Sequence, residues 1–208
     1  MTTPEGILAQ INHPSGWDGW IPTRRPGGFR PFEPKVEEVR SEDIIFGLAG
    51  TWRFGGNTPP RMTVAEHVVF VSYIIEELWG RQFAVAGLLH DACETYTHDL
   101  QSPLRRFVTL TMPDGEVISW NELDRRVSLV IFDRYGIDRQ WLDHPQVKAA
   151  DILSAVFEKR DSKSLSQTDD WGLPEIPPEI AHWKLNYYSP EEAETFLRAR
   201  WAELGLPR

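Results

Sequence analysis

Residues 63–80 read TVAEHVVFVSYIIEELWG and largely decide the fold class of this 208-residue chain. Thr63 and Glu66 stand at the spacing of a capping box, which opens a helix. Apolar residues then recur at helical spacing, at Val64, Val68, Val71, Ile75 and Leu78. Gly80 follows, and glycine commonly ends a helix. The stretch therefore predicts a core helix that carries His67 in its first turn.

Comparable helical signals occur along the rest of the chain, at 41–50, 81–97, 119–136, 145–160 and from 189 onward. Ser41 is the expected cap of the first of these helices. Ser119 with Glu122, and Ser189 with Glu192, repeat the spacing of a capping box. These signals indicate that most of the chain is helical.

Strand signals are confined to 107–111 and 117–118, on either side of Pro113-Asp114-Gly115. Proline, aspartate and glycine between two short apolar runs are typical of a hairpin. The predicted fold class is therefore all-α, a helical bundle with a small β-hairpin flap.

The N-terminal 40 residues are rich in proline, glycine and tryptophan and predict an irregular arm, 1–40, followed by one domain, 41–208. A disordered tail is the alternative to an ordered arm. The apolar residues Trp17, Trp20, Ile21 and Phe29 favour an arm that packs on the body of the domain.

The net charge of −9 argues against a general nucleic-acid or membrane-surface binder, because such proteins need a basic face. Residues 1–10 lack the pattern of a signal peptide, and no apolar run is long enough for a membrane span. The single cysteine, Cys93, excludes an internal disulfide framework and is expected to be a small buried residue. We therefore expect a cytoplasmic protein. Nine tryptophans exceed the needs of a core, which suggests a homo-oligomer.

The chemistry of the chain centres on His90-Asp91, with Glu94 on the same stretch, His67 upstream and Asp151 downstream. Two imidazoles and two carboxylates, each on a predicted helix, can converge on one divalent metal ion. Nitrogen and oxygen ligands that leave room for water are typical of a catalytic metal site. Glu94 would lie just outside the ligands, where a carboxylate can take up and deliver a proton.

A His-Asp pair is weak evidence alone, and a second pair, His98-Asp99, is expected to lie in a loop after the helix. Taken alone, such a pair is more often surface or helix-end chemistry than a metal site. The context favours His90-Asp91, because an apolar helix precedes it and Glu94 is in register with it.

Several segments together resemble the HD-domain phosphohydrolase superfamily, closest to the bacterial and phage branch of 5′-deoxynucleotidases and deoxyadenosine triphosphohydrolases. The resemblance covers most of the chain. The H…HD…D pattern is matched by His67, His90-Asp91 and Asp151. The matching segments are Trp20 to Thr23, Arg53-Phe54-Gly55-Gly56, Thr63 to His67, His90 to Arg105 and Ser189 to Ala193.

Two positions depart from the patterns of related proteins. Asn57 stands where phage relatives often have histidine. Thr95 follows Glu94, where guanosine-tetraphosphate hydrolases of the superfamily carry aspartate. This difference argues against an alarmone such as guanosine tetraphosphate as the substrate.

The resemblance implies an HD-domain helical bundle and a role for each matching residue. The metal ligands would be His67, His90, Asp91 and Asp151, holding one divalent transition metal such as Co, Mn, Zn or Fe. An additional Mg or Co ion with a triphosphate is compatible with it. The catalytic residues would be Glu94, as general acid and base, and Asp99, near the reacting phosphate or the sugar. The phosphate-binding residues would be Arg53, Arg105 and Lys148.

The function that the resemblance implies is hydrolysis of the P–O5′ bond of a small-molecule substrate, a 2′-deoxynucleotide. The phage-like segments favour a triphosphohydrolase, which converts a dNTP to a deoxynucleoside and triphosphate. A 5′-nucleotidase acting on deoxynucleoside monophosphates breaks the same bond, and sequence does not separate the two. A non-catalytic nucleotide-binding or interaction protein is the alternative from another class, which the presence of all four ligands and Glu94 argues against.

Overall fold

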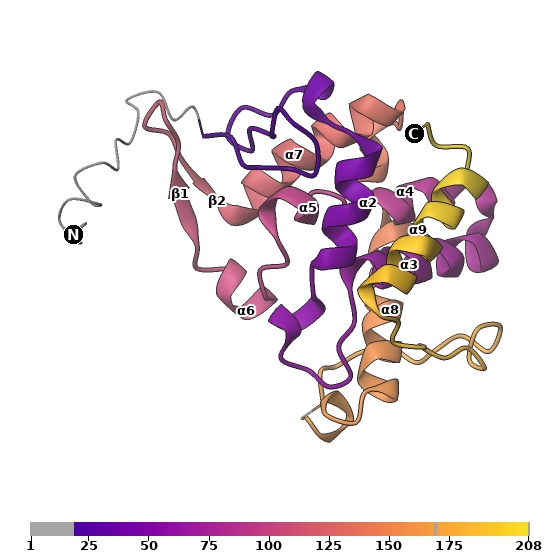
Figure 1. Cartoon of the computed structure of the whole chain (residues 1–208). Helices are drawn as coiled ribbons and strands as arrows, with labels where there is room; N and C mark the ends of the chain where they lie inside the picture. The colour runs from indigo at the N-terminus through magenta and orange to yellow at the C-terminus, as the bar shows by residue number, and fades with distance from the viewer. Residues whose placement is uncertain (1–18, 169, 208) are drawn as a thin grey trace, which may run out of the picture.

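The computed structural model describes residues 19–168 and 170–207. In this part of the chain the structure is mostly helical, with a small two-stranded antiparallel sheet (Figure 1). The predicted all-α class with a small hairpin is confirmed. The first 18 residues of the expected arm, Trp17 among them, lie outside the described residues.

Helix α3 (Val64–Trp79) is the central element of the bundle. It packs against α2 (Ser41–Gly50), α4 (Ala84–Leu89), α8 (Pro145–Asp161) and α9 (Pro190–Glu203) (Figure 1). Its buried residues divide between two apolar clusters. Val64, Ala65 and Val68 belong to one, with α2, α4 and α9. Val71, Ile74 and Ile75 belong to the other, with α8. This helix is thus buried on more than one side, which explains its nearly continuous apolar sequence.

The expected start and end of α3 are observed, except for half of the capping box. Thr63 Oγ1 accepts from the backbone N–H of Glu66 at 3.1 Å, and Gly80 ends the helix with a φ of 105°. The carboxylate of Glu66 does not return to the helix start. It accepts from the backbone N–H groups of Tyr187 and Tyr188, at 2.9 and 3.1 Å. The Glu66 carboxylate thus bonds a segment distant in sequence instead of the backbone N–H of Thr63, which the capping box would use.

The helix expected over 81–97 is wrong as one continuous element. The segment contains a 3-10 turn at Arg81–Phe83, α4, and α5 (Glu94–Thr97), with a tight turn at 90–93. The amide of Glu94 bonds to the carbonyl of Asp91, three residues earlier, instead of four. The carbonyl of Gly87, which would accept from residue 91 in a continuous helix, accepts from His90 Nδ1 at 2.7 Å. The His90 side chain therefore occupies a carbonyl that a continuous helix would use for a backbone hydrogen bond.

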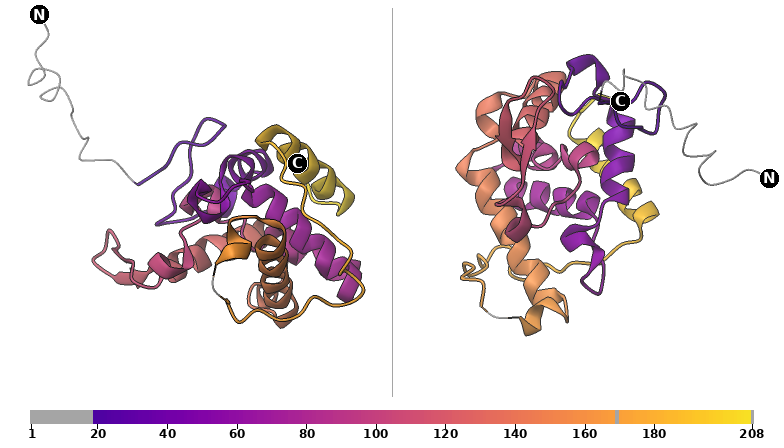
Figure 2. Two further views of the ribbon diagram at one scale, coloured as in Figure 1. Left: turned by 90° about the horizontal axis from the view of Figure 1, so that it is seen from below. Right: turned by 90° about the vertical axis from the view of Figure 1, so that its left-hand side faces the viewer.

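The predicted hairpin is confirmed, with a first strand shorter than the expected 107–111 and a second strand one residue longer than the expected 117–118. Strands β1 (Thr109–Thr111) and β2 (Val117–Ser119) pair antiparallel, with Leu110 opposite Ile118. The hairpin projects from the bundle at the left of Figure 1, and the views of Figure 2 agree. Helix α7 (Trp120–Tyr135) follows directly, capped by the side chain of Ser119 as predicted.

The remaining elements complete the bundle. They are helix α6 (Ser102–Arg105) and 3-10 turns at Val36–Glu38, Arg53–Gly56, Arg139–Trp141 and Leu165–Gln167. The capping box of α9 forms in full at Ser189 and Glu192. The expected cap by Ser41 is wrong, because its hydroxyl donates to the carbonyl of Pro207 at 2.7 Å and Arg40 occupies the cap position.

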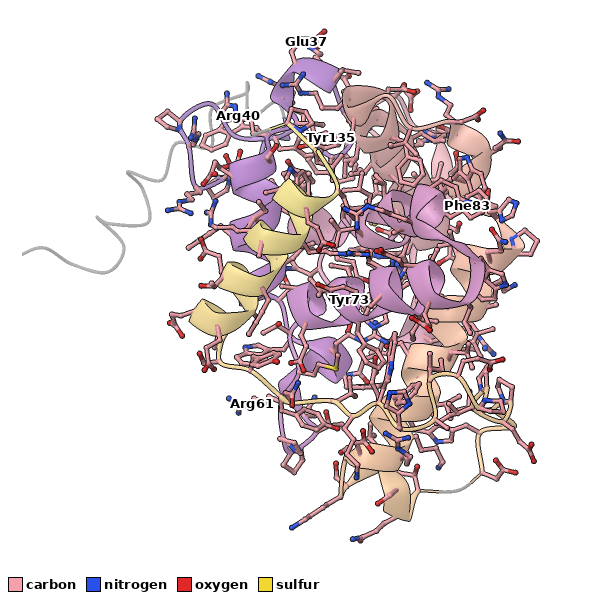
Figure 3. The ribbon with its side chains drawn as sticks, turned by 90° about the vertical axis from the view of Figure 1, so that its right-hand side faces the viewer. Glu37, Arg40, Arg61, Tyr73, Phe83 and Tyr135 are labelled. Atoms are coloured by element: carbon pink, nitrogen blue, oxygen red, sulfur yellow. The ribbon has the colours of Figure 1, made fainter. Side chains whose placement is uncertain are left out.

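Residues 19–40 lie against the bundle. Ile21 and Phe29 exchange two backbone hydrogen bonds, and the buried ring of Phe29 stacks on Tyr96 with centroids 3.7 Å apart. Figure 3 shows Arg40 and Tyr135 at the end of the molecule where this segment joins α2. Cys93 is buried as expected. In the described parts of the chain, no helix combines the length and apolar composition that crossing a membrane requires.

Candidate metal centre

Three parts of the bundle bring the predicted metal ligands together. His67 comes from the first turn of α3, His90 and Asp91 from the tight turn after α4, and Asp151 from α8. Each residue offers one ligand atom, and the four atoms lie within 4.8 Å of one another. Gly87 lets α3 and α4 approach closely, since a Cβ there would lie 2.5 Å from Cδ1 of Ile75.

The separations between the ligand atoms suit a single ion. His67 Nε2 lies 3.3 Å from His90 Nε2, 3.5 Å from Asp91 Oδ2 and 3.2 Å from Asp151 Oδ1. His90 Nε2 lies 3.3 Å from Asp91 Oδ2 and 3.8 Å from Asp151 Oδ1. Ligands about 2.0–2.2 Å from one ion stand roughly 3.0–3.6 Å apart in octahedral or tetrahedral geometry. The cluster therefore fits one divalent ion with little rearrangement.

The other nitrogen of each imidazole has a partner that orients the ring. His67 Nδ1 lies 2.9 Å from Glu158 Oε1 and 3.1 Å from Ser154 Oγ. His90 Nδ1 donates to the Gly87 carbonyl. Because a carbonyl and a carboxylate only accept, both Nδ1 atoms carry the proton. In the neutral rings, both Nε2 lone pairs then point at the two carboxylates, an arrangement that a cation must hold together.

The charges of the cluster also fit a divalent ion. Asp91, Asp151 and Glu158 carry three negative charges, and the buried guanidinium of Arg53 beside them carries one positive charge. Two negative charges are left over. One divalent ion balances them, and so do two protons on the imidazoles.

The pKa values show how protons take the place of an ion. Burial acts to lower the pKa of His90, but the carboxylates of Asp91 and Asp151 outweigh it and raise that pKa to about 10. Burial acts to raise the pKa of Asp91, but His90 and His67 hold it well below its ordinary value. In the absence of an ion, His90 therefore carries a second proton near neutral pH, and an ion must displace it.

Solvent can reach the cluster on one side. His67 is fully buried, whereas the side chain of Asp151 is 43% exposed. The open side of the cluster therefore lies at α8. An ion held by the four candidate ligands would therefore be accessible to solvent on this side.

Glu94 lies beside the cluster without belonging to the four ligands. It is buried, and its Oε2 has no hydrogen-bond partner among the described residues. Burial raises the pKa of the Glu94 carboxyl well above its ordinary value, and the charges of Asp91 and Asp99 raise it further. A carboxyl group with a raised pKa keeps its proton to a higher pH than an ordinary glutamate, and such a group can donate a proton.

Asp99 lies in the loop after α5, as predicted for the His98-Asp99 pair. Its Oδ2 accepts from the backbone N–H of Phe54 at 2.9 Å. The structure thus connects Asp99 with the segment that carries Arg53, in addition to placing its charge near Asp91 and Glu94.

The three predicted phosphate-binding residues are in different environments. The guanidinium of Arg53 lies at the cluster, 3.2 Å from Glu158 and 3.7 Å from Asp91. Arg105 forms an ion pair with Asp124 of α7. Lys148 lies on the exposed side of α8, three residues before Asp151. The structure therefore brings only Arg53 into contact with the metal-binding group.

A cavity of about 410 Å³ opens elsewhere, between α3, α9 and the segment 183–188. It is mostly apolar, and Tyr73, labelled in Figure 3, lines it. None of the four candidate ligands lines this cavity. The convergent candidate ligands and the buried carboxyl group of Glu94, and not this cavity, mark the candidate active site.

Two curated proteins resemble this chain, and no protein-family model matches it. The uncharacterized protein YfdR of Escherichia coli (strain K12) is 26% identical over 169 residues, 81% of this chain and 86% of that protein. An uncharacterized protein of Rhodobacter capsulatus is 30% identical over 149 residues, 66% of this chain and 69% of that protein. This chain belongs to the same family as the Rhodobacter protein. The names of these relatives state no activity, so the function must be argued from the site.

The residues that support the candidate ligands were not predicted from the sequence. Glu158 bonds both His67 and Arg53, and Ser154 bonds both His67 and Glu158. A signal was present, because Asp151, Ser154 and Glu158 stand at i, i+3 and i+7 and so share one face of α8. The Gly87 carbonyl left no such signal, since any residue has a carbonyl.

Proposed function

We propose that this protein is a metal-dependent phosphohydrolase that cleaves the P–O5′ bond of 2′-deoxynucleotides. The observation that carries the proposal is the convergence of four ligand atoms, within 4.8 Å of one another, beside the buried carboxyl group of Glu94, whose pKa is raised by burial. The resemblance of the same residues to HD-domain phosphohydrolases supports the choice of reaction.

Different residues would bind the metal and donate the proton. His67, His90, Asp91 and Asp151 would hold one divalent transition metal. When bound, this ion would polarise the phosphate and activate water. Glu94 would donate its proton to the departing O5′ atom, which otherwise leaves as an unstable alkoxide.

Arg53 is the cation best placed to bind the reacting phosphate. Its guanidinium lies 3.7 Å from Asp91 and is held by the buried carboxylate of Glu158. A guanidinium held at this position could donate hydrogen bonds to a phosphate oxygen. Arg53 would thus stabilise charge on the phosphate without a change of conformation.

A dNTP is the favoured substrate, and the products would be a deoxynucleoside and triphosphate. Hydrolysis of a monophosphate breaks the same P–O5′ bond, so the two reactions need the same metal centre. They differ in the outer phosphates, which need additional cations. Lys148 is exposed and stands three residues before Asp151 on α8, so the two share one side of the helix, and Lys148 could supply one such cation.

A 5′-nucleotidase is the second candidate, and one observation favours it. Arg105, the other cation predicted for the outer phosphates, is already paired with Asp124. If Arg105 stays with Asp124, only Lys148 is available among the predicted cations beyond Arg53. A monophosphate substrate requires no more than that.

Product analysis tests the proposal and separates the two candidates. The protein, loaded in turn with Co²⁺, Mn²⁺, Zn²⁺ or Fe²⁺, is incubated with each deoxynucleoside monophosphate and triphosphate. Release of triphosphate supports the triphosphohydrolase, and release of phosphate from monophosphates alone supports the nucleotidase. The Asp91→Ala variant is the control for contaminating hydrolases. No product beyond this control with any metal would leave a non-catalytic nucleotide-binding protein as the better proposal.

A further inference from the structure

The segment around Arg53 has a backbone conformation that its sequence alone does not favour. Phe54 has a φ of 55° and a ψ of 28°, in the left-handed region, and Gly55 and Gly56 follow with φ of 60° and 71°. Glycine adopts such angles freely, but phenylalanine rarely does because of its Cβ atom. Contacts from elsewhere in the molecule must therefore hold Phe54 in place.

Two side chains from the loop after α5 hold both sides of Phe54. Asp99 Oδ2 accepts from its N–H, and Gln101 Nε2 donates to its carbonyl, each at 2.9 Å. Gly55 fits beneath Gln101, since a Cβ at this position would lie 2.9 Å from Gln101 Nε2. The turn therefore has the shape that Asp99 and Gln101 impose on it.

The other parts of the segment are also attached. The backbone N–H of Arg53 donates to the Met62 carbonyl at 2.9 Å. Arg61, labelled in Figure 3, donates from Nε to the Gly56 carbonyl at 3.1 Å. Arg53 thus stands between a backbone bond on its own amide and the Asp99 bond on the next amide. Loss of the Asp99 bond would release the peptide that directs the Arg53 side chain toward Glu158 and Asp91.

We infer that Asp99 is a positioning residue, which acts through the backbone of Phe54 to place Arg53 at the metal centre, and that it transfers no proton. Its chemical requirement is a hydrogen-bond acceptor at the Oδ2 position. The inference deepens the proposed function and rests on it wherever the readout is hydrolysis. It departs from the catalytic role that the family resemblance implies for this residue.

Two substitutions at the same position separate positioning from proton transfer. Asp99→Asn keeps an oxygen that can accept from Phe54 but cannot take up a proton. Asp99→Ala removes the acceptor. We expect kcat/KM of Asp99→Asn to stay close to wild type, and that of Asp99→Ala to fall by roughly 10- to 100-fold, as for other supporting residues. A loss of about 10²-fold or more in Asp99→Asn, equal to that in Asp99→Ala, would show proton transfer and overturn the inference.

A double-mutant cycle tests whether Asp99 acts through Arg53. If it does, Asp99→Ala should cost little further activity in an Arg53→Ala background, because the group that it positions is already gone. Losses that multiply independently would contradict the inference.

Hydrogen exchange gives a readout that needs no activity, and so separates this inference from the proposed function. The Phe54 amide should exchange slowly in wild type and Asp99→Asn, and much faster in Asp99→Ala, with the helices unchanged. Asp114→Ala is the matched control, since Asp114 also accepts a backbone N–H, from Glu116, but in the distant hairpin turn. Equal protection of Phe54 in all four proteins would overturn the inference even if the enzyme hydrolyses deoxynucleotides. If no deoxynucleotide is hydrolysed, the exchange result still decides the positioning role.

Discussion

The four candidate metal ligands and the three predicted phosphate-binding residues differ in how far the fold prepares them. The ligand atoms of the first group already lie at distances that suit one ion, and both imidazoles are oriented by buried partners. In the second group, Arg53 and Arg105 are paired with carboxylates and Lys148 is exposed. The candidate metal centre is thus formed in advance. Binding of a polyphosphate requires some of these cations to take on or exchange partners.

The largest effect is expected at Glu94, which lies beside the candidate ligands. Glu94→Gln should lower kcat by about 10²–10⁴-fold, the usual contribution of proton transfer, while the metal content stays at the wild-type level. The physical reason is that glutamine fits the buried position but has no acidic proton. Turnover at the wild-type rate would remove Glu94 from the mechanism. If the Glu94→Gln variant lost its metal, Glu94 would have to be counted as a ligand.

A smaller effect is expected at Glu158, which joins the two groups. Glu158→Ala removes the partner of His67 Nδ1 and of the Arg53 guanidinium. Such supporting residues typically contribute about 10–100-fold to metal affinity, so we expect a loss of this size by competitive titration with a chelator. Glu179→Ala, at an exposed position, is the control. Unchanged metal affinity in Glu158→Ala would mean that the ligands bind the ion without Glu158 to orient His67.

The cations should differ from one another when substrates are compared. Arg53→Ala should reduce kcat/KM for a deoxynucleoside monophosphate and its triphosphate alike, because Arg53 lies at the metal centre. Lys148→Ala and Arg105→Ala should weaken the triphosphate more, because the outer phosphates carry charge that the metal does not neutralise. Equal losses on both substrates at Lys148 and Arg105 would favour the 5′-nucleotidase.

The smallest effect concerns pH and the stability of the metal-free protein. The pKa of His90 is raised to about 10 in the fold, whereas it is about 6.5 in an unfolded chain. A raised pKa contributes stability that is fully present below about pH 6.5 and is lost as the pH rises toward 10. The free energy of unfolding of the metal-free protein should therefore fall between pH 6.5 and 10 more than that of the metal-loaded protein. Denaturant titrations of both forms measure it, and parallel curves would contradict the protonated cluster.

Sequence predicted those features that depend on local patterns. The helical class, the hairpin and the caps at Thr63, Ser119 and Ser189 follow from turn residues and apolar spacing, and the structure contains them. The convergence of His67 with His90 was also accessible, because both stand on apolar segments that had to pack together.

Sequence did not predict features that depend on a partner distant along the chain. Glu66 leaves its capping box for Tyr187 and Tyr188, which no local pattern indicates. The turn at 90–93 was missed for another reason: its bond from His90 Nδ1 to the Gly87 carbonyl is local, but any residue has a carbonyl, so the sequence does not mark it. Asp99 was expected near a phosphate, whereas its hydrogen bond to Phe54 depends on a left-handed turn that only the assembled loops stabilise.

The metal content of purified protein tests the central claim most directly. After saturation with one divalent transition metal and removal of the excess, elemental analysis should find one ion per chain in wild type. Asp91→Ala should contain essentially none, and Asp114→Ala, in the hairpin turn, should match wild type. Circular dichroism should show that the helical fold persists in both variants. If Asp91→Ala retains one ion per chain, the site formed by His67, His90, Asp91 and Asp151 is not the metal centre of this protein.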